Sequence, residues 1–352
     1  MESAPFEFLS TLLETPSPSG FEEKIQAKVR GYISEFADEV NIDVHGNLIA
    51  AVNTSAKLRV MLAGHCDQIG MIITHIDAEG FLYAQTIGGW DPQQLIGQRM
   101  SIWTNDGSIP AVISKKPIHL LSDEERKQNA KFEDLWLDIG ASSEDDARSI
   151  VQIGDFVTLD LGIKLMRNNL ANAPGMDNRT GLWVVMEALR RVSGRTLNCS
   201  VYSVSTVQEE IGLRGAKTSA FGIDPHVAIA VDVTHATDCP TIDKRRQGDL
   251  SLGRGPVIFR GPNMNPNVSK QLIDISASQK IPAQVAAIGR ATSNDANSLQ
   301  INRSGVATGL VAIPNRYMHS AVETISLDDL DNAADLLAEF LTAIPENADF
   351  TP

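Results

Sequence analysis

Apolar strand patterns and amphipathic helical patterns alternate through the second half of the chain, and this alternation limits the fold more than any other feature. The strand candidates are CSVYSVSTV (residues 199–207), HVAIAVDV (226–233), AQVAAIG (283–289) and VATGLVAIP (306–314). Helical spacing is found between and around them, at residues 180–192, 215–221, 268–280, 295–303 and 327–344. Because strands and helices take turns along the chain, the sequence predicts an α/β domain in which helices cover a sheet.

The first 69 residues continue this pattern, whereas residues 70–161 do not. Helices are expected from Pro5 to Leu13 and from Phe21 to Phe36, followed by the strand candidates NLIAAVN and LRVMLAG, of which the second ends at His65. Beyond them, short strand-like pieces such as MIITHI, FLYAQT and MSIWT are separated by the turn signals DAEG and NDG, which is typical of a small β barrel. We therefore predict an α/β domain of residues 1–69 and 162–352 that carries a β-rich insert at residues 70–161.

The start of the last helix carries a capping signal. Ser326 precedes the helical pattern and Asp329 follows three residues later, an arrangement typical of a capping box.

Composition excludes several classes of protein. No apolar run approaches twenty residues, so no membrane span is expected, and a formal net charge of -14 disfavours nucleic acid and anionic membranes as partners. The N-terminal MESAPFEFLS has no basic flank before an apolar core, and three cysteines (Cys66, Cys199 and Cys239) cannot all pair. These features predict a soluble protein of the cytoplasm.

Titratable side chains cluster where the predicted strands end, which is where α/β sheets gather their functional groups. They are His65, Asp67, Glu209, Glu210, Asp232 and His319, with Asp177 in the loop before a long helix. Taken singly, each has a structural explanation, such as a helix cap, a turn or a core histidine. One dinuclear metal site would explain them together, and a set of histidines and carboxylates without thiolate suits zinc, cobalt or manganese.

The adjacent pair Glu209 and Glu210 indicates the chemistry. Neighbouring residues at a strand end point in opposite directions, so one carboxylate could bind a metal while the other faces a water. Two metals about 3.5–4 Å apart could bridge that water and lower its pKa towards about 7, and the second carboxylate could carry its proton. The pair therefore predicts hydrolysis.

Five motifs carry a family resemblance. GHCDQIG, APGMDNRTG, VQEEIGLRGA, AVDVTHATD and RYMHS, in this order, resemble the M42 family of metallo-aminopeptidases, the group of tetrahedral and glutamyl aminopeptidases. The resemblance covers nearly the whole chain. It implies a mixed-sheet α/β/α domain like that of the co-catalytic zinc peptidases, with an inserted small β-barrel dimerisation domain. It also implies short peptides with a free N-terminus as substrates, and a homo-oligomer built from dimers, up to a tetrahedral dodecamer.

The same resemblance implies a role for each site residue. Asp177 would bridge two divalent ions, Glu210 and His319 would complete one coordination sphere, and His65 and Asp232 would complete the other. Glu209 would be the general base, and Asp67 would hold the ring of His65. The peptide bond between Asp177 and Asn178 is expected to be cis.

The chain departs from the family pattern at two positions, and other functions remain open. Gln68 stands where many relatives have glutamate, and Cys239 stands where they usually have a small hydroxyl residue. The alternatives are a deacylase or carboxypeptidase of the same clan, a metal-binding protein without catalysis, and an endoglucanase. The last is disfavoured because only 5% of the residues are aromatic, and sugar stacking needs exposed aromatic rings.

Overall fold

The apolar runs of the sequence form the centre of an eight-stranded sheet in the computed structural model, which describes residues 1–352. The strand order is β1 (Glu39–Ile42), β2 (Leu48–Val52), β12 (Ser200–Thr206), β3 (Arg59–His65), β13 (Val227–His235), β16 (Ala307–Asn315), β14 (Val257–Arg260) and β15 (Gln284–Ala287). The four central strands β12, β3, β13 and β16 are parallel, whereas β1–β2, β2–β12 and β14–β16 are antiparallel pairs. The sheet is therefore mixed, as the family resemblance implies.

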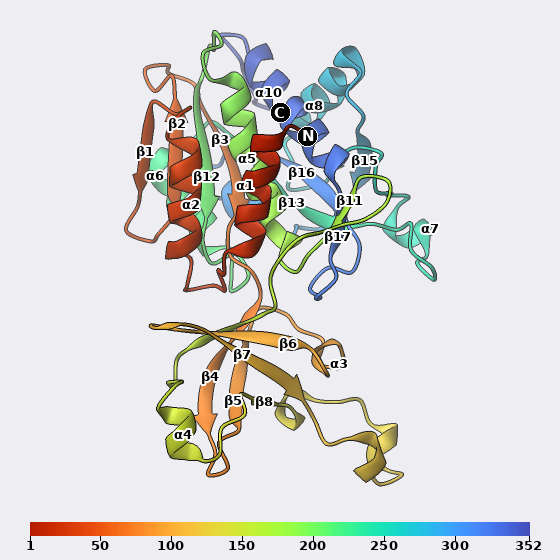
Figure 1. The fold of residues 1–352 in the computed structure, drawn as a ribbon. Helices are drawn as coiled ribbons and strands as arrows, with labels where there is room; N and C mark the ends of the chain where they lie inside the picture. Colours follow the sequence, from red (N-terminus) through yellow and green to blue (C-terminus); the bar gives the residue numbers. More distant parts are fainter.

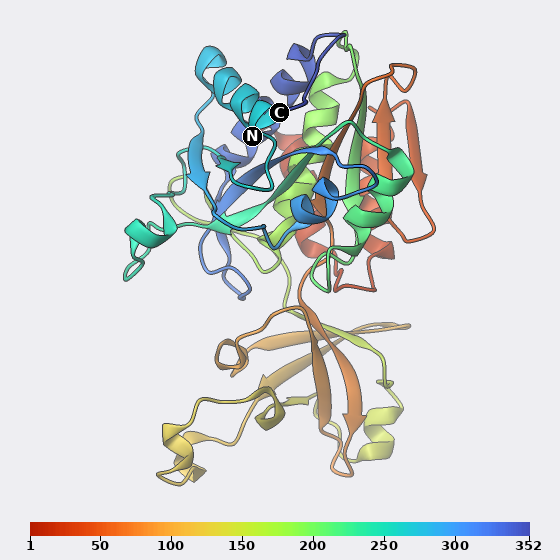
Figure 2. The same cartoon turned by 180° about the vertical axis from the view of Figure 1, so that it is seen from behind.

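Helices cover both faces of this sheet (Figures 1 and 2). One face carries α1 (Ser3–Glu14), α2 (Glu23–Ile33), α5 (Met176–Val192), α8 (Pro266–Gln279) and α10 (Leu327–Ala343), and the other carries α6 (Arg214–Ile223) and α9 (Asp295–Gln300). Side chains alternate between the faces along a strand. In β3, Val60 and Leu62 accordingly join the larger core, while Met61 and Ala63 pack with α6 and α9.

A closed barrel forms a second body below the sheet in Figure 1. Its strands, in order around the barrel, are β4 (Gly70–Ile76), β5 (Leu82–Ile87), β8 (Trp136–Asp138), β7 (Gly107–Ser114), β6 (Arg99–Thr104) and β9 (Phe156–Leu159). The short helices α3 (Pro92–Leu95) and α4 (Glu144–Arg148) accompany it. The barrel has its own core, including Met71 and Ile102, and meets the α/β layers where the rings of Phe21 and Phe156 stack with centroids 5.0 Å apart.

Short elements complete the fold. A three-stranded sheet combines β10 (Lys164–Leu165), β11 (Leu170–Asn172) and β17 (Thr324–Ser326), and α7 (Lys244–Gln247) lies in a loop after β13. None of the helices combines the length and the apolar character needed to cross a membrane.

The capping box predicted at Ser326 and Asp329 is wrong. Helix α10 does begin after Ser326, but the Ser326 side chain makes no capping hydrogen bond. The carboxylate of Asp329 instead accepts the backbone N–H groups of Gly253 and Gly255, at 2.8 and 2.7 Å. A carboxylate that satisfies two amides of a neighbouring loop cannot also turn back to its own helix start.

Candidate metal centre

The central parallel strands deliver the predicted site residues to one edge of the sheet. His65 is the last residue of β3, Glu209 and Glu210 follow β12, and Asp232 lies within β13. Asp177 is in the first turn of α5, and His319 lies in the loop between β16 and β17. The peptide bond between Asp177 and Asn178 is cis. The structure thus brings together all the side chains that the strand ends singled out.

The two oxygens of Asp177 face two different histidines. Asp177 Oδ1 lies 3.2 Å from His65 Nε2, and Asp177 Oδ2 lies 3.2 Å from His319 Nε2. On the first side, Glu209 Oε2 and Asp232 Oδ1 lie 3.8 and 3.9 Å from His65 Nε2. On the second side, Glu210 Oε2 lies 3.5 Å from His319 Nε2. The structure therefore has two adjoining groups of ligand atoms with Asp177 between them.

The spacing and chemistry of both groups fit divalent ions. The ligand atoms within each group, His65–Glu209–Asp232 and Asp177–Glu210–His319, all lie within 4.8 Å of one another. Bonds of 2.0–2.2 Å in tetrahedral geometry place neighbouring ligand atoms about 3.3–3.6 Å apart, close to the separations observed. Glu209 belongs to the first group by this criterion, yet Asp177 Oδ1 is nearer to His65 Nε2, at 3.2 rather than 3.8 Å. Asp177 is thus the better shared ligand of the two.

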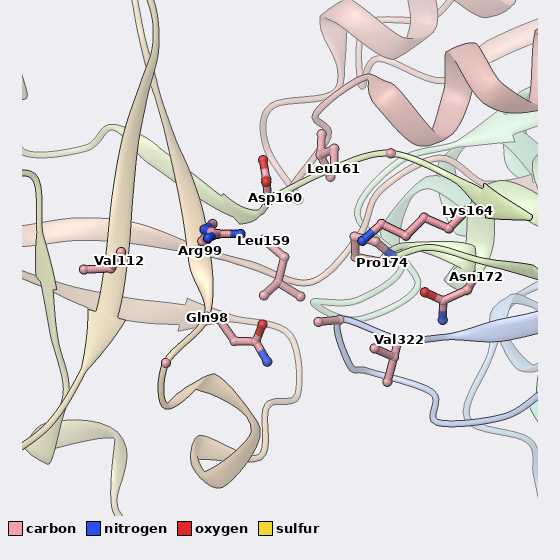
Figure 3. Close-up of a pocket in the computed structure, with 13 residues that line it drawn as sticks. Gln98, Arg99, Val112, Leu159, Asp160, Leu161, Lys164, Asn172, Pro174 and Val322 are labelled. Atoms are coloured by element: carbon pink, nitrogen blue, oxygen red, sulfur yellow. The ribbon is translucent and has the colours of Figure 1, made fainter. Parts of the chain in front are cut away.

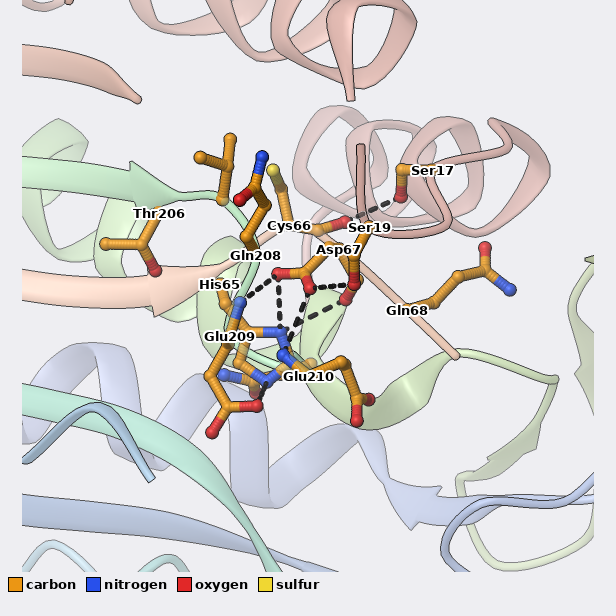
Figure 4. Close-up of polar contacts among 12 residues, drawn as sticks. Ser17, Ser19, His65, Cys66, Asp67, Gln68, Thr206, Gln208, Glu209 and Glu210 are labelled. Carbon is orange, nitrogen blue, oxygen red and sulfur yellow. Dashed lines mark hydrogen bonds and ion pairs between the residues drawn. The ribbon is translucent and has the colours of Figure 1, made fainter. Parts of the chain in front are cut away.

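Asp67 fixes both the His65 ring and the turn that carries the two glutamates (Figure 4). His65 Nδ1 lies 3.0 Å from the backbone carbonyl oxygen of Asp67 and 3.3 Å from its carboxylate. The carboxylate accepts the backbone N–H groups of Glu209 and Glu210, at 3.0 and 3.2 Å, and the hydroxyl of Ser19 at 2.6 Å. With Nδ1 engaged in this way, Nε2 of His65 is the nitrogen left to face a metal.

Burial makes three carboxyl groups of this cluster, Glu209, Glu210 and Asp232, hold protons when no cation is bound. Burial alone would also raise the pKa of Asp177, but its contacts with His319 and His65 lower it. Burial raises the pKa of both Glu209 and Glu210 well above the usual range, and neighbouring carboxylates add to the effect. Burial likewise raises the pKa of Asp232 to about 8. Burial alone would lower the pKa of His319, but its contacts with Asp177 and Glu210 raise it to about 9. A divalent cation would relieve this crowding of negative charge and displace the protons.

These shifts predict how the stability of the metal-free protein depends on pH. Asp232 keeps its proton up to about pH 8 when folded, but only to about pH 4 when unfolded. The folded state then binds more protons, so the free energy of unfolding falls as the pH rises through that window. His319 acts in the same direction, because its contribution is complete below about pH 6.5 and is lost as the pH rises through its folded pKa of about 9.

We therefore expect the melting temperature of the metal-free protein to fall between about pH 5 and about pH 9. The increase in melting temperature on adding metal should become larger over the same range, since ligands must lose their protons to bind. Differential scanning calorimetry of stripped and metal-loaded protein checks both. A stabilisation by metal that shrinks as the pH rises would contradict this account of the site.

Three contributors to the site were not predicted from the sequence. Glu323 accepts the backbone N–H groups of Asp177 and His319, Ser19 donates to Asp67, and the carbonyl oxygen of Gly89 lies 2.8 Å from His319 Nδ1. Two of them act through backbone groups, which leave no side-chain pattern in a sequence. The only available signal for Glu323 is its position four residues after a candidate ligand.

Gln68, one of the departures from the family pattern, points away from the ligands in Figure 4. Its side-chain oxygen accepts a hydrogen bond from the fully buried guanidinium of Arg179, which also donates to the carbonyl of Thr15 and the hydroxyl of Ser17. The amide at position 68 therefore changes the surroundings of Arg179 and leaves the set of ligand atoms intact.

A cavity of about 650 Å³ lies between the barrel and the α/β layers (Figure 3). Arg99 and Lys164 line it together with Asp160, and Val322 brings the loop of His319 to its wall. None of the predicted site residues lines this cavity, so the cluster at the strand ends remains the candidate for chemistry.

Comparison with known proteins identifies the family. Residues 46–336 match the M42 glutamyl aminopeptidase family. The chain belongs to this family. It is accordingly a metal-dependent aminopeptidase, a hydrolase that acts on N-terminal residues.

Individual relatives of this M42 aminopeptidase match it along nearly its whole length. A lysyl aminopeptidase from Pyrococcus furiosus is 37% identical over 353 residues, which cover 99% of each chain. The structure of a TET aminopeptidase from a marine sediment archaeon of the Thaumarchaeota has a TM-score of 0.92 and 34% identity, covering 97% of this chain and 96% of that one. A TET1 peptidase from Pyrococcus horikoshii, which can assemble into a tetrahedron or a large octahedral shell, has a TM-score of 0.86 and 30% identity, covering 97% of this chain and all of that one.

Proposed function

We propose that this M42 aminopeptidase binds two divalent metal ions and releases N-terminal residues from short peptides. The observation that carries the proposal is the position of Asp177, whose two carboxylate oxygens each lie 3.2 Å from Nε2 of a different histidine. A carboxylate that faces two ligand groups at once is suited to bridge two ions. Zinc and cobalt, and also manganese, suit these histidine and carboxylate ligands.

The ligands divide between the two ions as follows in this proposal. Asp177 would be shared, His65 and Asp232 would hold one ion, and Glu210 and His319 would hold the other. Two ions in such a site lower the pKa of a water and polarise the carbonyl group of the bond to be cleaved.

Glu209 is the proposed general base and acid. Its side chain is 10% exposed and lies beside His65, but farther from Nε2 than Asp177 does. Asp67 holds the backbone N–H of Glu209, so the carboxylate is presented from a fixed turn. In this role Glu209 takes a proton from the attacking water and delivers it to the leaving amine.

The competing functions are those of a deacylase or carboxypeptidase of the same clan. The function of an endoglucanase is a weaker competitor. Membership of the M42 family favours the aminopeptidase over each of them. A panel of aminoacyl chromogenic amides with N-acetylated controls distinguishes the aminopeptidase from the deacylase, using stripped enzyme to which cobalt, zinc or manganese is returned. We expect metal to restore hydrolysis and acetylation to block it. Hydrolysis of the acetylated substrates would favour a deacylase. A metal-loaded protein that hydrolyses no substrate with a free amino group would favour a deacylase or a non-catalytic protein.

We also propose that residues 1–69 and 162–352 form the catalytic domain, and that the barrel domain, residues 70–161, makes a homodimer that builds larger assemblies. The assembly of the Pyrococcus horikoshii relative into closed shells supports this proposal. Apolar side chains exposed on the barrel domain, among them Ile118 and Leu120 at 63% and 67%, support it too. Light scattering should give the mass of a dimer or of a multiple of dimers, and a single species of monomer mass would contradict it. A cytoplasmic location stays a prediction.

A further inference from the structure

Glu323 is a buried carboxylate in contact with the backbone of two proposed ligands. Its side chain is in the loop between β16 and β17, and the residue is 1% exposed. Glu323 Oε1 accepts the backbone N–H of His319 at 2.7 Å, and Oε2 accepts the backbone N–H of Asp177 at 2.8 Å. Each oxygen thus binds a different ligand residue, although Glu323 itself belongs to neither group of ligand atoms.

His319 has few other constraints on its position. Strand β16 ends at Asn315, so ladder hydrogen bonds do not fix His319 as they fix His65. The backbone of His319 is left-handed, with φ of 60°, and its side chain is 32% exposed, whereas that of His65 is 1% exposed. A non-glycine residue rarely adopts this conformation unless its surroundings hold it there. Apart from the contacts of its Nε2 with Asp177 and Glu210, His319 is held by the hydrogen bond from its backbone N–H to Glu323 and by the contact of its Nδ1 with the Gly89 carbonyl.

Glu323 also forms hydrogen bonds with the segment that precedes Asp177. Its backbone carbonyl accepts the N–H of Ala173 at 3.0 Å and the side-chain amide of Asn172 at 3.1 Å. Side chain and backbone of Glu323 therefore join the start of α5 to the loop of His319. Asp67 makes the matching arrangement on the other side of the site, where its carboxylate accepts the N–H groups of Glu209 and Glu210.

A carboxylate at this place has a cost that its hydrogen bonds must offset. Burying another negative charge beside Asp177 is unfavourable unless the charge is well hydrogen-bonded. Two backbone N–H groups at 2.7 and 2.8 Å are strong partners of that kind. Neither oxygen is then needed as a ligand, and both serve to set the distance between the two ligand residues.

We propose that Glu323 is a positioning residue that aligns Asp177 and His319, and that its loss weakens mainly the ion held by Asp177, Glu210 and His319, because that ion uses both of these ligands whereas the other ion uses only Asp177. The proposal rests on the two-metal site proposed above. Glutamine is the sharpest probe, because it has nearly the shape of glutamate but only one acceptor oxygen. Its NH₂ group would face a backbone N–H, so one of the two ligand residues must lose its partner.

The test counts the metal bound per chain in a series of variants at fixed free cobalt, using full-length protein. Glu323→Gln should bind the ion of the His319 group about 10–100-fold more weakly, the usual loss when an outer-shell partner is removed, and should bind the other ion with a clearly smaller loss. Asp232→Asn should weaken the other ion, and the double variant should retain neither. Glu346→Gln, at an exposed position, is the control and should behave as the wild type.

Several results would overturn the proposal. The proposal is wrong if Glu323→Gln binds both ions with wild-type affinity. It is also wrong if the double variant loses no more bound metal than Asp232→Asn alone. Glu323→Asp keeps both carboxylate oxygens on a shorter side chain. Its metal affinity should fall between those of the wild type and Glu323→Gln, and its cobalt absorption spectrum should resemble that of the wild type more closely than the spectrum of Glu323→Gln does. If Glu323→Gln unfolds, equal binding by Glu323→Asp and the wild type would still overturn the proposal. A wild-type protein that binds no metal would instead refute the proposed function.

Discussion

Replacing Glu209 by glutamine is expected to lower kcat by about 10²–10⁴-fold, the usual contribution of a positioned acid or base. The metal content should stay unchanged, because Asp177 rather than Glu209 is the nearer partner of His65. Glutamine keeps the shape of the side chain and the hydrogen bond from the backbone N–H to Asp67, but it cannot take up a proton. Steady-state kinetics on an aminoacyl amide, with metal analysis of the same sample, measures both quantities.

The neighbouring glutamate provides a matched control. Glu210→Gln makes the same chemical change one residue later, but at a proposed ligand, whose carboxylate lies 3.5 Å from His319 Nε2. We expect it to lose metal affinity first and activity as a consequence, with partial recovery at high metal concentration. Glu209→Gln should show no recovery at any metal concentration. Near-normal turnover in Glu209→Gln would assign the base to another residue.

Replacing Asp177 by asparagine is expected to have the largest effect on metal binding. The side chain keeps its size but loses its charge and one of the two oxygens that face His65 and His319. Both ions share this ligand in the proposed site, so we expect the affinity for each to fall by more than the roughly 10–100-fold loss typical of an outer-shell change. Activity should then be absent at metal concentrations that saturate the wild type.

Calorimetry separates this loss of metal from a loss of fold. Metal that binds only the folded state stabilises it by about 4 kcal/mol when its concentration is 1,000 times its Kd. The wild type should therefore melt at a higher temperature with metal, whereas Asp177→Asn should melt at the same temperature with and without it. An undiminished response to metal in Asp177→Asn would exclude Asp177 as the shared ligand.

Strand ends made much of this site predictable from the sequence. His65, Glu209 and Asp232 follow or end apolar runs that become the parallel strands β3, β12 and β13. Parallel strands end at one edge of a sheet, so the sequence positions of these side chains already implied that they meet. The central part of the fold was predictable for the same reason, because long apolar runs leave few alternatives.

The features of the site and the fold that the sequence did not predict depend on backbone groups, on a short edge strand and on contacts between distant loops. Glu323 acts on N–H groups, which every residue has, so its partners could not be identified before the loop of His319 was placed. Strand β1 (Glu39–Ile42) has only four residues and is largely exposed, too short for an apolar period to be visible. Asp329 matched a capping box in sequence, but the fold brings two amides from another loop to its carboxylate.

A metal titration measures whether two metal ions held around Asp177 are required for aminopeptidase activity. Cobalt is added to stripped enzyme, and bound metal per chain and turnover of an aminoacyl amide are measured in the same samples. We expect no turnover without metal and full turnover only when both ligand groups are filled. Full turnover in the stripped enzyme, or saturation at a single ion per chain, would contradict this expectation.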